Sequence, residues 1–166
     1  NEKQWIGNGF VIPAGPLREE LSSLKRADYV VINGKKNTNI EKQILLNNNK
    51  IKIYYTIHIP KNIDEFKNRK IIAFAGIGNP ENFIDLLKDH KVNIVEKIHF
   101  PDHYNYSDKD LENLINKAKN INAILLTTEK DYLRIKENYK KNINFLKIKS
   151  KIENQNHFIE EIKNLL

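Results

Sequence analysis

The sequence predicts an α/β protein with a mostly parallel sheet flanked by helices. Short apolar runs recur from residue 70 onwards, and segments with helical spacing of apolar residues separate them; the runs cover 70–77, 92–98, 122–127 and 143–148. Strands that alternate with helices of about 10 residues are typical of a parallel sheet with helices on its faces. The 166 residues are 40% hydrophobic and 30% charged, which indicates a globular chain with either one sizeable core or a domain plus part of another.

The first 60 residues are less regular. Residues 1–28 are irregular and marked by Gly and Pro. Residues 29–34 (YVVING) predict a short buried strand that ends at Asn-Gly. Residues 35–50 are polar and predict a short helix followed by an Asn-rich loop. Residues 51–60 (IKIYYTIHIP) alternate in polarity and carry β-branched and aromatic side chains, which predicts a strand.

Two helices in the second half have recognisable starts. Asn79 is a candidate N-cap, with Pro80 in the first turn and Glu81 near the positive end of the helix dipole. Ser107 and Asp110 stand three residues apart before an apolar stripe, like a capping box with Asp in place of Glu. Further helices are expected over residues 131–139 and 157–166.

The composition of the chain limits the compartments and partners that are expected for it. It has no Cys, hence no disulfide or thiolate metal site, which fits a reducing compartment. No run approaches the roughly 18 apolar residues that span a bilayer, and no signal-peptide pattern opens the sequence. The net charge of +7 allows a polyanionic partner, but Lys, Asn and Ile are scattered throughout, which favours a general compositional bias. A basic stripe with interleaved aromatic residues is missing, so no nucleic-acid partner is expected, whereas an anionic membrane surface would attract this charge.

Three loops should carry any function. Ligands of parallel sheets bind beyond the carboxyl ends of the strands. The loops that follow the predicted strands read GIGNPE (76–81), HFPDHYNY (99–106) and TTEKD (127–131). All three are therefore expected on the same rim of the sheet.

The first of these loops resembles a dinucleotide fingerprint only in part. Gly76 and Gly78 give Gly-x-Gly after a strand, but Glu81 stands where G-x-G-x-x-G has its third Gly, and its charge would repel a pyrophosphate. A tight strand-to-helix turn is the favoured interpretation. A P-loop of the form G-x-x-x-x-G-K-[ST] does not occur in the 166 residues.

The other two loops leave alternatives open. Thr128 is either an ordinary N-cap before a charged turn or part of a site in which Lys130 reaches an anion. His103 in PDHY could act as a general base with Asp102 nearby, or the stretch could be a structural turn. His99, at the end of a strand, could be structural, and the remaining histidines show no metal-ligand spacing.

The N-terminal stretch PAGPLREEL (13–21) carries a further candidate pair. Arg18 and Glu19 follow two prolines that stiffen the chain. They could open a helix with acidic residues on its dipole. Alternatively, Arg18 could bind a phosphate or carboxylate, with Glu19 orienting it or binding a metal.

Five motifs together resemble one family. In order, they are GNGFVIPAGPLREEL, RADYVVING, AFAGIGNPENF, FPDHYNYSDKDL and LLTTEKD, between roughly residues 5 and 135. This set resembles the tetraacyldisaccharide 4'-kinases, the lipid A 4'-kinases, and matches their C-terminal half only. The resemblance implies a P-loop kinase that phosphorylates the 4' hydroxyl of a lipid A disaccharide precursor with ATP and Mg²⁺. It also implies a peripheral protein at the cytoplasmic face of the bacterial inner membrane.

The resemblance assigns roles to several residues. His103 matches the family's catalytic base, which pairs with an Asp of the kinase domain, and Asp102 would support His103 or its loop. Arg18 would hold the anionic sugar-lipid headgroup, with Glu19 beside it in the Mg²⁺ and phosphate network. The residues expected near the nucleotide or another anion are Gly76, Thr128 and Lys130. No metal ligand is assigned with certainty.

The resemblance also divides the chain. Residues 1–33 would be the C-terminal remnant of the P-loop kinase domain, 34–60 a hinge with a β-strand, and 61–166 the C-terminal α/β domain. The P-loop domain would lie upstream, and this chain alone is expected to be inactive. The alternative is a non-catalytic α/β module that binds a nucleotide or nucleotide sugar, for which the Gly-x-Gly turn is the support.

Overall fold

The computed structural model describes residues 2–164, which form two compact units. The first unit contains the residues up to Ile59 and those from Ser150 onwards, and the second contains Pro60–Lys149. Each unit has its own sheet and is described separately below.

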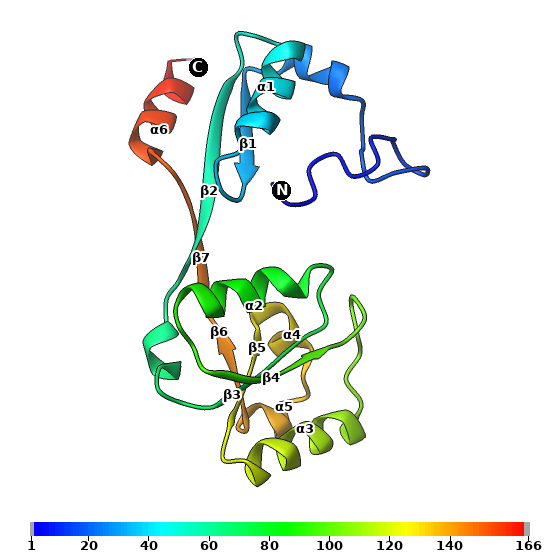
Figure 1. Ribbon diagram of the computed structural model, residues 1–166, viewed down its shortest axis with the longest axis vertical. Helices are drawn as coiled ribbons and strands as arrows, with labels where there is room; N and C mark the ends of the chain where they lie inside the picture. The colour runs from blue at the N-terminus through cyan, green and yellow to red at the C-terminus, as the bar shows by residue number, and fades with distance from the viewer. Residues whose placement is uncertain (1, 165–166) are drawn as a thin grey trace. The chain divides into compact units, whose positions relative to one another are not determined.

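The second unit is built on a parallel sheet (Figure 1). Its strands are β3 (Ile71–Ala75), β4 (Ile94–His99), β5 (Ile124–Thr128) and β6 (Ile143–Leu146). They are ordered β4-β3-β5-β6, and every neighbouring pair is parallel. The predicted α/β class with a mostly parallel sheet is therefore confirmed.

Helices cover both faces of this sheet. They are α2 (Pro80–Asp89), α3 (Asp108–Asn120), α4 (Glu129–Arg134), α5 (Glu137–Lys140) and the 3₁₀ helix η2 (Ile63–Phe66). Figure 1 shows α2 and α3 on opposite sides of the sheet. The single helix predicted over 131–139 is wrong, because the backbone is extended at Ile135 (φ −75°, ψ 135°) and separates α4 from α5. The Ile135 side chain is buried, so packing overrides helix continuity there.

The core of the second unit has two layers, one on each side of β3. All five residues of β3 are buried, and they alternate between the layers as a strand requires. On one side, Ile71, Ala73 and Ala75 share a cluster with residues of α2; these are Phe83, Ile84 and Leu87. On the other side, Ile72 and Phe74 share a cluster with residues of α3; these are Leu111, Leu114, Ile115 and Ala118.

The two predicted helix starts have different outcomes. Ser107 Oγ accepts a hydrogen bond from the Asp110 backbone N–H at 3.2 Å, and Asp110 Oδ2 accepts one from the Ser107 N–H at 3.0 Å. This reciprocal pair confirms the capping box at α3. Asn79 does occupy the N-cap position of α2, before Pro80, but its side chain makes no capping hydrogen bond. The predicted N-cap position of Asn79 is therefore correct, but its side chain does not cap the helix.

The first unit contains a smaller three-stranded sheet. Its strands are β1 (Tyr29–Asn33), β2 (Lys52–Pro60) and β7 (Ile148–Ile152), in the order β1-β2-β7, with β1 parallel to β2. The helices are η1 (Leu21–Arg26), α1 (Thr38–Asn47) and α6 (Gln155–Lys163). The sequence did not predict β7, because its IKSKI pattern is charged and largely exposed.

Helix α6 is attached to β2 through one acidic side chain. Glu161 accepts hydrogen bonds from Lys52 Nζ and from the Tyr54 hydroxyl, and the Phe158 ring lies 4.8 Å from the Tyr54 ring. These bonds hold the pKa of the Glu161 carboxyl below its usual value. They also raise the pKa of Tyr54 to about 12. The helix predicted over 157–166 starts earlier, at Gln155, and its last two residues lie outside the described part.

The two units do not coincide with the domains expected from the sequence. The predicted boundary near residue 60 falls at the start of the second unit, but residues 150 onwards group with the first unit. Strands β2 and β7 are the two segments through which the chain passes between units. That residues 1–33 are the remnant of a kinase domain, and 34–60 a hinge, stays a prediction.

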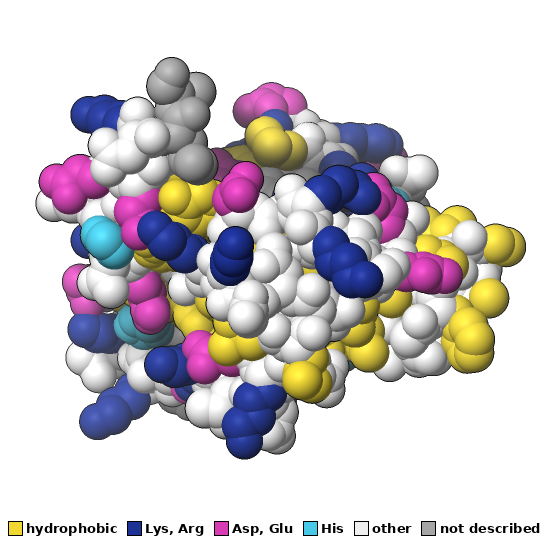
Figure 2. Space-filling model, turned by 90° about the horizontal axis from the view of Figure 1, so that it is seen from above, with side chains coloured by type: hydrophobic (Ala, Val, Ile, Leu, Met, Phe, Trp, Pro, Cys, Tyr) yellow, Lys and Arg dark blue, Asp and Glu magenta, His cyan; other side chains and the backbone are white. Residues whose placement is uncertain are grey.

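The described surface is charged and contains no membrane span. Lys and Arg side chains are interspersed with Asp and Glu on the face shown in Figure 2, so the positive charge there is not gathered into one stripe. Among residues 2–164, no helix combines the length and apolar character that crossing a bilayer requires.

We expect Leu126→Ala to destabilise the chain by about 2–5 kcal/mol, because Leu126 is fully buried in β5 and its truncation leaves a cavity. Leu133→Ala is the matched control, since Leu133 is 72% exposed on α4. It should change the free energy of unfolding by less than about 0.5 kcal/mol. Urea unfolding followed by circular dichroism measures both, and equal losses would contradict the described core.

We expect acid to release α6 from β2. The lowered pKa of Glu161 means that its contribution is complete above the unfolded value and is lost as pH falls through the folded one. Limited proteolysis within α6 should therefore accelerate below about pH 4, near the ordinary Glu pKa. In the Glu161→Gln variant, α6 should be cleaved rapidly at every pH. The control Glu160→Gln, on the same helix, should keep the pH dependence of the original chain.

Candidate active site

Polar side chains gather at the carboxyl edge of the parallel sheet in the second unit. They come from the ends of β3, β4 and β5 and from helix α4. We call them the Asp131 cluster, and its members are Gly76, His103, Thr128, Asp131 and Arg134. The expectation that the three loops open on one rim is therefore met in the second unit.

Asp131 is the centre of this cluster and is fully buried. Its Oδ2 accepts hydrogen bonds from the Gly76 backbone N–H at 3.1 Å and from Thr128 Oγ1 at 2.7 Å. Thr128 Oγ1 in turn accepts from the Asp131 N–H at 3.2 Å and so caps α4. Asp131 thereby ties the end of β3 to the start of α4.

Arg134 connects the buried carboxylate to the exposed loop. Its Nη1 lies 3.7 Å from Asp131 Oδ1, the oxygen that has no hydrogen-bond partner among the described residues. Nη1 also donates to the Gly76 carbonyl at 3.3 Å. Nη2 lies 3.1 Å from His103 Nδ1. The guanidinium therefore links Asp131, the backbone of Gly76 and the imidazole of His103.

His103 stands at the tip of its loop with 79% of its side chain exposed. Its φ of 59° lies in the left-handed region, which is uncommon for a residue with a side chain and is often found at functional sites. The loop is held there by the His103 N–H, which donates to the Gly76 carbonyl at 3.1 Å and to Asp102 Oδ1 at 3.0 Å. Asp102 Oδ2 is 3.9 Å from His103 Nε2, beyond hydrogen-bond range. Asp102 therefore supports the loop backbone.

The aromatic residues of the same loop form a packed group beneath it. Phe100, Tyr104 and Tyr106 are in mutual ring contact, and Phe74 of β3 packs against Phe100 and Tyr106. The Tyr106 hydroxyl is buried, and burial together with the nearby Asp131 charge raises the pKa of Tyr106. The aromatic residues thus form the floor on which the His103 loop rests.

A glycine is needed at position 76, where the packed aromatic residues of the loop meet the end of β3. A Cβ placed on it would lie 3.0 Å from the Tyr106 hydroxyl and 3.1 Å from Tyr104 Cβ. The residue therefore allows a close approach, as the tight-turn interpretation predicts. Its N–H is already bound to Asp131, and a Cβ on Gly78 would lie 3.1 Å from Asp102 Oδ2. Carboxylates at both glycines oppose a pyrophosphate at this turn.

The remaining predicted site residues lie outside the cluster or play another part in it. Thr128 is the N-cap of α4, so the ordinary capping alternative is confirmed. Lys130 is exposed on α4 and makes no hydrogen bond or ion pair with another described residue. Arg18 and Glu19 belong to the first unit and are exposed. Glu19 is hydrogen-bonded to Arg26, which lowers the pKa of Glu19, so it does not orient Arg18.

Sequence reasoning missed the two residues that organise the cluster, Asp131 and Arg134. Asp131 was included in the TTEKD motif only as part of a charged first turn. Its position three residues after Thr128 was an available signal, because Thr-x-x-Asp is a variant of the capping box. Arg134 had no signal in the sequence, since its contacts depend on where the His103 loop returns.

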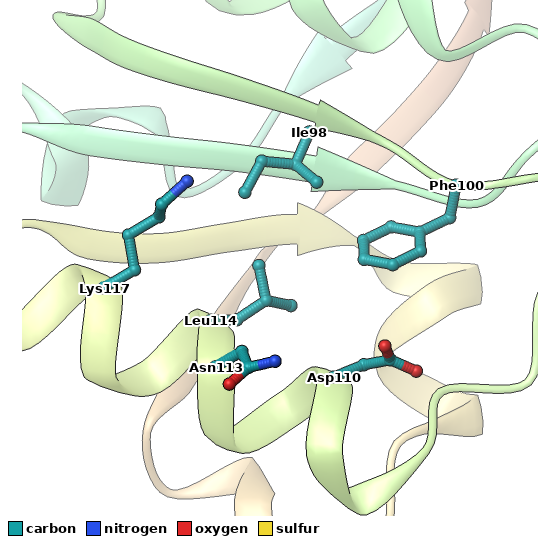
Figure 3. A pocket seen from close by; sticks show the side chains of 6 residues that line it. All are labelled: Ile98, Phe100, Asp110, Asn113, Leu114 and Lys117. Atoms are coloured by element: carbon teal, nitrogen blue, oxygen red, sulfur yellow. The ribbon is translucent and has the colours of Figure 1, made fainter.

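Two shallow hollows lie elsewhere on the surface. One, of about 160 Å³, lies beside α3 and β4 in the second unit, and Figure 3 shows the six side chains that line it. Its two charged groups are engaged, Asp110 with Tyr104 and Ser107, and Lys117 with Glu96. The other, of about 330 Å³, lies in the first unit; its cationic lining residues are Lys25, Arg26, Lys50 and Lys52. Among residues 2–164, no three acidic or histidine side chains come together to hold a metal ion.

A parallel sheet with polar groups gathered at its carboxyl edge defines an α/β protein whose ligands bind at the strand ends. A sequence model of the tetraacyldisaccharide-1-P 4'-kinases matches residues 1–166, and the chain belongs to this family. The chain is 44% identical to the tetraacyldisaccharide 4'-kinase of Pelagibacter ubique (strain HTCC1062) over 168 residues, covering 99% of this chain and 51% of that protein.

Two further relatives give the same picture. The enzymes of the same name from Rickettsia bellii (strain OSU 85-389) and Rickettsia akari (strain Hartford) are 44% and 40% identical, each over 98% of this chain. The matches cover 50% and 49% of those proteins, so the chain spans about half the length of the curated relatives it matches. No solved structure matches the chain significantly.

We expect Asp131→Asn to destabilise the chain by about 2–4 kcal/mol, because it removes the charge that faces Arg134 inside a buried site. Asp108→Asn is the matched control, since Asp108 pairs with Lys136 on the surface and its loss should destabilise the chain clearly less. Urea unfolding at neutral pH measures both. A loss at Asp131 no larger than the loss at Asp108 would show that Asp131 does not organise the cluster.

Proposed function

We propose that this chain acts as part of an ATP-dependent lipid A 4'-kinase. The reaction would transfer the γ-phosphate of ATP to the 4' hydroxyl of a tetraacyldisaccharide 1-phosphate. The observation that carries the proposal is the family match over residues 1–166. The geometry supports it, because phosphoryl transfer requires mainly positioning, charge neutralisation and a group that takes the hydroxyl proton.

His103 is the proposed proton acceptor. The imidazole is exposed at the carboxyl edge of the sheet, where a second molecule or domain can reach it. Its loop is ordered by Gly76 and by Asp102, which we propose as its supporting residue. An imidazole that is exposed on an ordered loop can be reached by a substrate hydroxyl, as general base catalysis requires.

Arg18 and Glu19 are the proposed substrate contacts in the first unit. Arg18 is exposed and makes no hydrogen bond or ion pair with another described residue, so its guanidinium is available for an anionic sugar-lipid headgroup. Glu19 is proposed to lie beside the headgroup, where its carboxylate is paired with Arg26. Lys130 is proposed to reach an anion from α4, whereas Gly76 and Thr128 would shape the edge through their bonds to Asp131.

The nucleotide and Mg²⁺ are proposed to bind outside these 166 residues. The sequence contains no P-loop, and the described residues do not fit a Mg²⁺ site, since no acidic cluster is present among them. The curated relatives are about twice as long. We propose that a P-loop domain outside this sequence supplies the phosphate cradle and that activity requires it.

The proposed location is the cytoplasmic face of the bacterial inner membrane, as a peripheral protein. The net charge of +7 would favour a surface of anionic lipids. Phe10 and Ile12 are 62% and 64% exposed in the first unit, and such side chains can enter a lipid interface. The alternative, a nucleotide-binding module without catalysis, has less support, because carboxylates crowd the Gly-x-Gly turn.

A chimera tests the proposal. The chain would replace the matching half of the Pelagibacter ubique kinase, to which it is 44% identical. We expect the chimera to transfer ³²P from ATP to tetraacyldisaccharide 1-phosphate, and the 166-residue chain alone to transfer none. A chimera that melts cooperatively but stays inactive would contradict the proposal, and tight binding of ATP, NAD or a nucleotide sugar by the chain alone would favour the module.

In this chimera, we expect His103→Ala to lower kcat by about 10²-fold or more, the usual scale for loss of a general base. KM should change little, because the imidazole acts on the reacting proton. His157→Ala is the matched control, since His157 is exposed on α6 of the other unit. An unchanged kcat for His103→Ala would make the PDHY loop a structural turn.

A further inference from the structure

We propose that Arg134 is a positioning residue that holds His103 in a resting state in which neither ring nitrogen can accept a proton. The inference rests on the proposed function, in which His103 takes the proton of the 4' hydroxyl. It concerns a residue that the sequence did not single out and that touches the imidazole directly.

The hydrogen bond between Arg134 and His103 fixes the tautomer of the imidazole. A guanidinium is always protonated and can only donate, so His103 Nδ1 accepts from Arg134 Nη2 at 3.1 Å. A neutral imidazole carries one proton, which must then be on Nε2. The lone pair of Nδ1 is occupied and Nε2 has none to offer, although the side chain is 79% exposed.

Arg134 is held firmly enough to impose this state. Its side chain is 26% exposed, and its Nη1 lies 3.7 Å from Oδ1 of the buried Asp131. It also donates to the Gly76 carbonyl, the same oxygen that binds the His103 N–H. Among the described residues, Asp102 is the other charged group in contact with the imidazole, and its Oδ2 lies 3.9 Å from Nε2. The backbone N–H of His103 binds the Gly76 carbonyl directly, and its side chain is linked to the same oxygen through Arg134.

Catalysis by His103 must break this contact. Uptake of a proton at Nδ1 requires Arg134 to withdraw. Uptake at Nε2 requires the existing proton to be on Nδ1, which Arg134 also prevents, because it has no lone pair to accept a hydrogen bond. Once the nitrogen is free, the 4'-hydroxyl proton moves to it while the hydroxyl oxygen bonds the γ-phosphorus and ADP leaves. Release of Arg134 would accompany the arrival of the substrate hydroxyl at His103.

Acylation of the imidazole tests the resting state without requiring activity. Diethyl pyrocarbonate needs a free lone pair on a ring nitrogen, so His103 in the full 166-residue chain should react slowly. We expect Arg134→Met to raise its rate by roughly three- to tenfold, the range for loss of one exposed hydrogen bond. Mass spectrometry of the peptide that contains His103 gives the rate.

Two variants separate this effect from a loss of structure. Arg69→Met is the matched control, because Arg69 is exposed elsewhere in the second unit and should leave the rate unchanged. Arg134→Lys keeps a cationic donor and should restore part of the protection. An Arg134→Met rate equal to that of the original chain would overturn the proposal, as would an equal increase in Arg69→Met.

The tautomer itself can be observed in the original chain, so the test survives if Arg134→Met fails to fold. Long-range ¹H–¹⁵N spectra of the ¹⁵N-histidine-labelled chain at pH 8.5 should show His103 with its proton on Nε2 and an unprotonated, hydrogen-bonded Nδ1. A proton on Nδ1 would overturn the proposal. If the spectra agree but the chimera is inactive, the resting geometry stands and the kinase assignment fails.

Discussion

The bond between the Asp131 carboxylate and the Gly76 N–H is the constraint on which the rest of the site depends. Strand β3 pairs with both β4 and β5, and the chain leaves β3 towards α2 on one face and β5 towards α4 near the other. The loops that follow β3 and β5 therefore leave the sheet towards opposite faces, as loops do at the switch point of a doubly wound sheet. Asp131 joins these loops, because its Oδ2 accepts hydrogen bonds both from the Gly76 N–H at the end of β3 and from Thr128 Oγ1, the N-cap of α4.

A buried carboxylate is costly unless its charge is compensated, and that cost explains the neighbours of Asp131. Two donors satisfy Oδ2, and the cation of Arg134 faces Oδ1. Arg134 also lies against the Gly76 carbonyl, and its Nη2 reaches the His103 loop. The contact between Arg134 and the exposed imidazole thus follows from electrostatics at the sheet edge.

Most of the fold could be predicted from the sequence because it depends on local periodicity. The apolar runs of β3 and β5 and the Ser107–Asp110 cap of α3 are signals carried by neighbouring residues. β7 could not be predicted, since its charged pattern becomes a strand only by pairing with β2. The same limit applies to the site. His103 can be proposed from the sequence because its motif is local, whereas the position of Arg134 beside it depends on a contact between residues 31 positions apart.

The His103 loop is ordered by contacts of its backbone and its aromatic residues, and the imidazole stays exposed. The aromatic rings of Phe100, Tyr104 and Tyr106 anchor it from below, and backbone bonds to Gly76 fix its tip, so the imidazole itself is not needed for packing. A side chain that is ordered through its backbone can change its hydrogen-bond partner without unfolding the loop. The left-handed φ of His103 is then the conformational cost of presenting its imidazole outward from a fixed backbone.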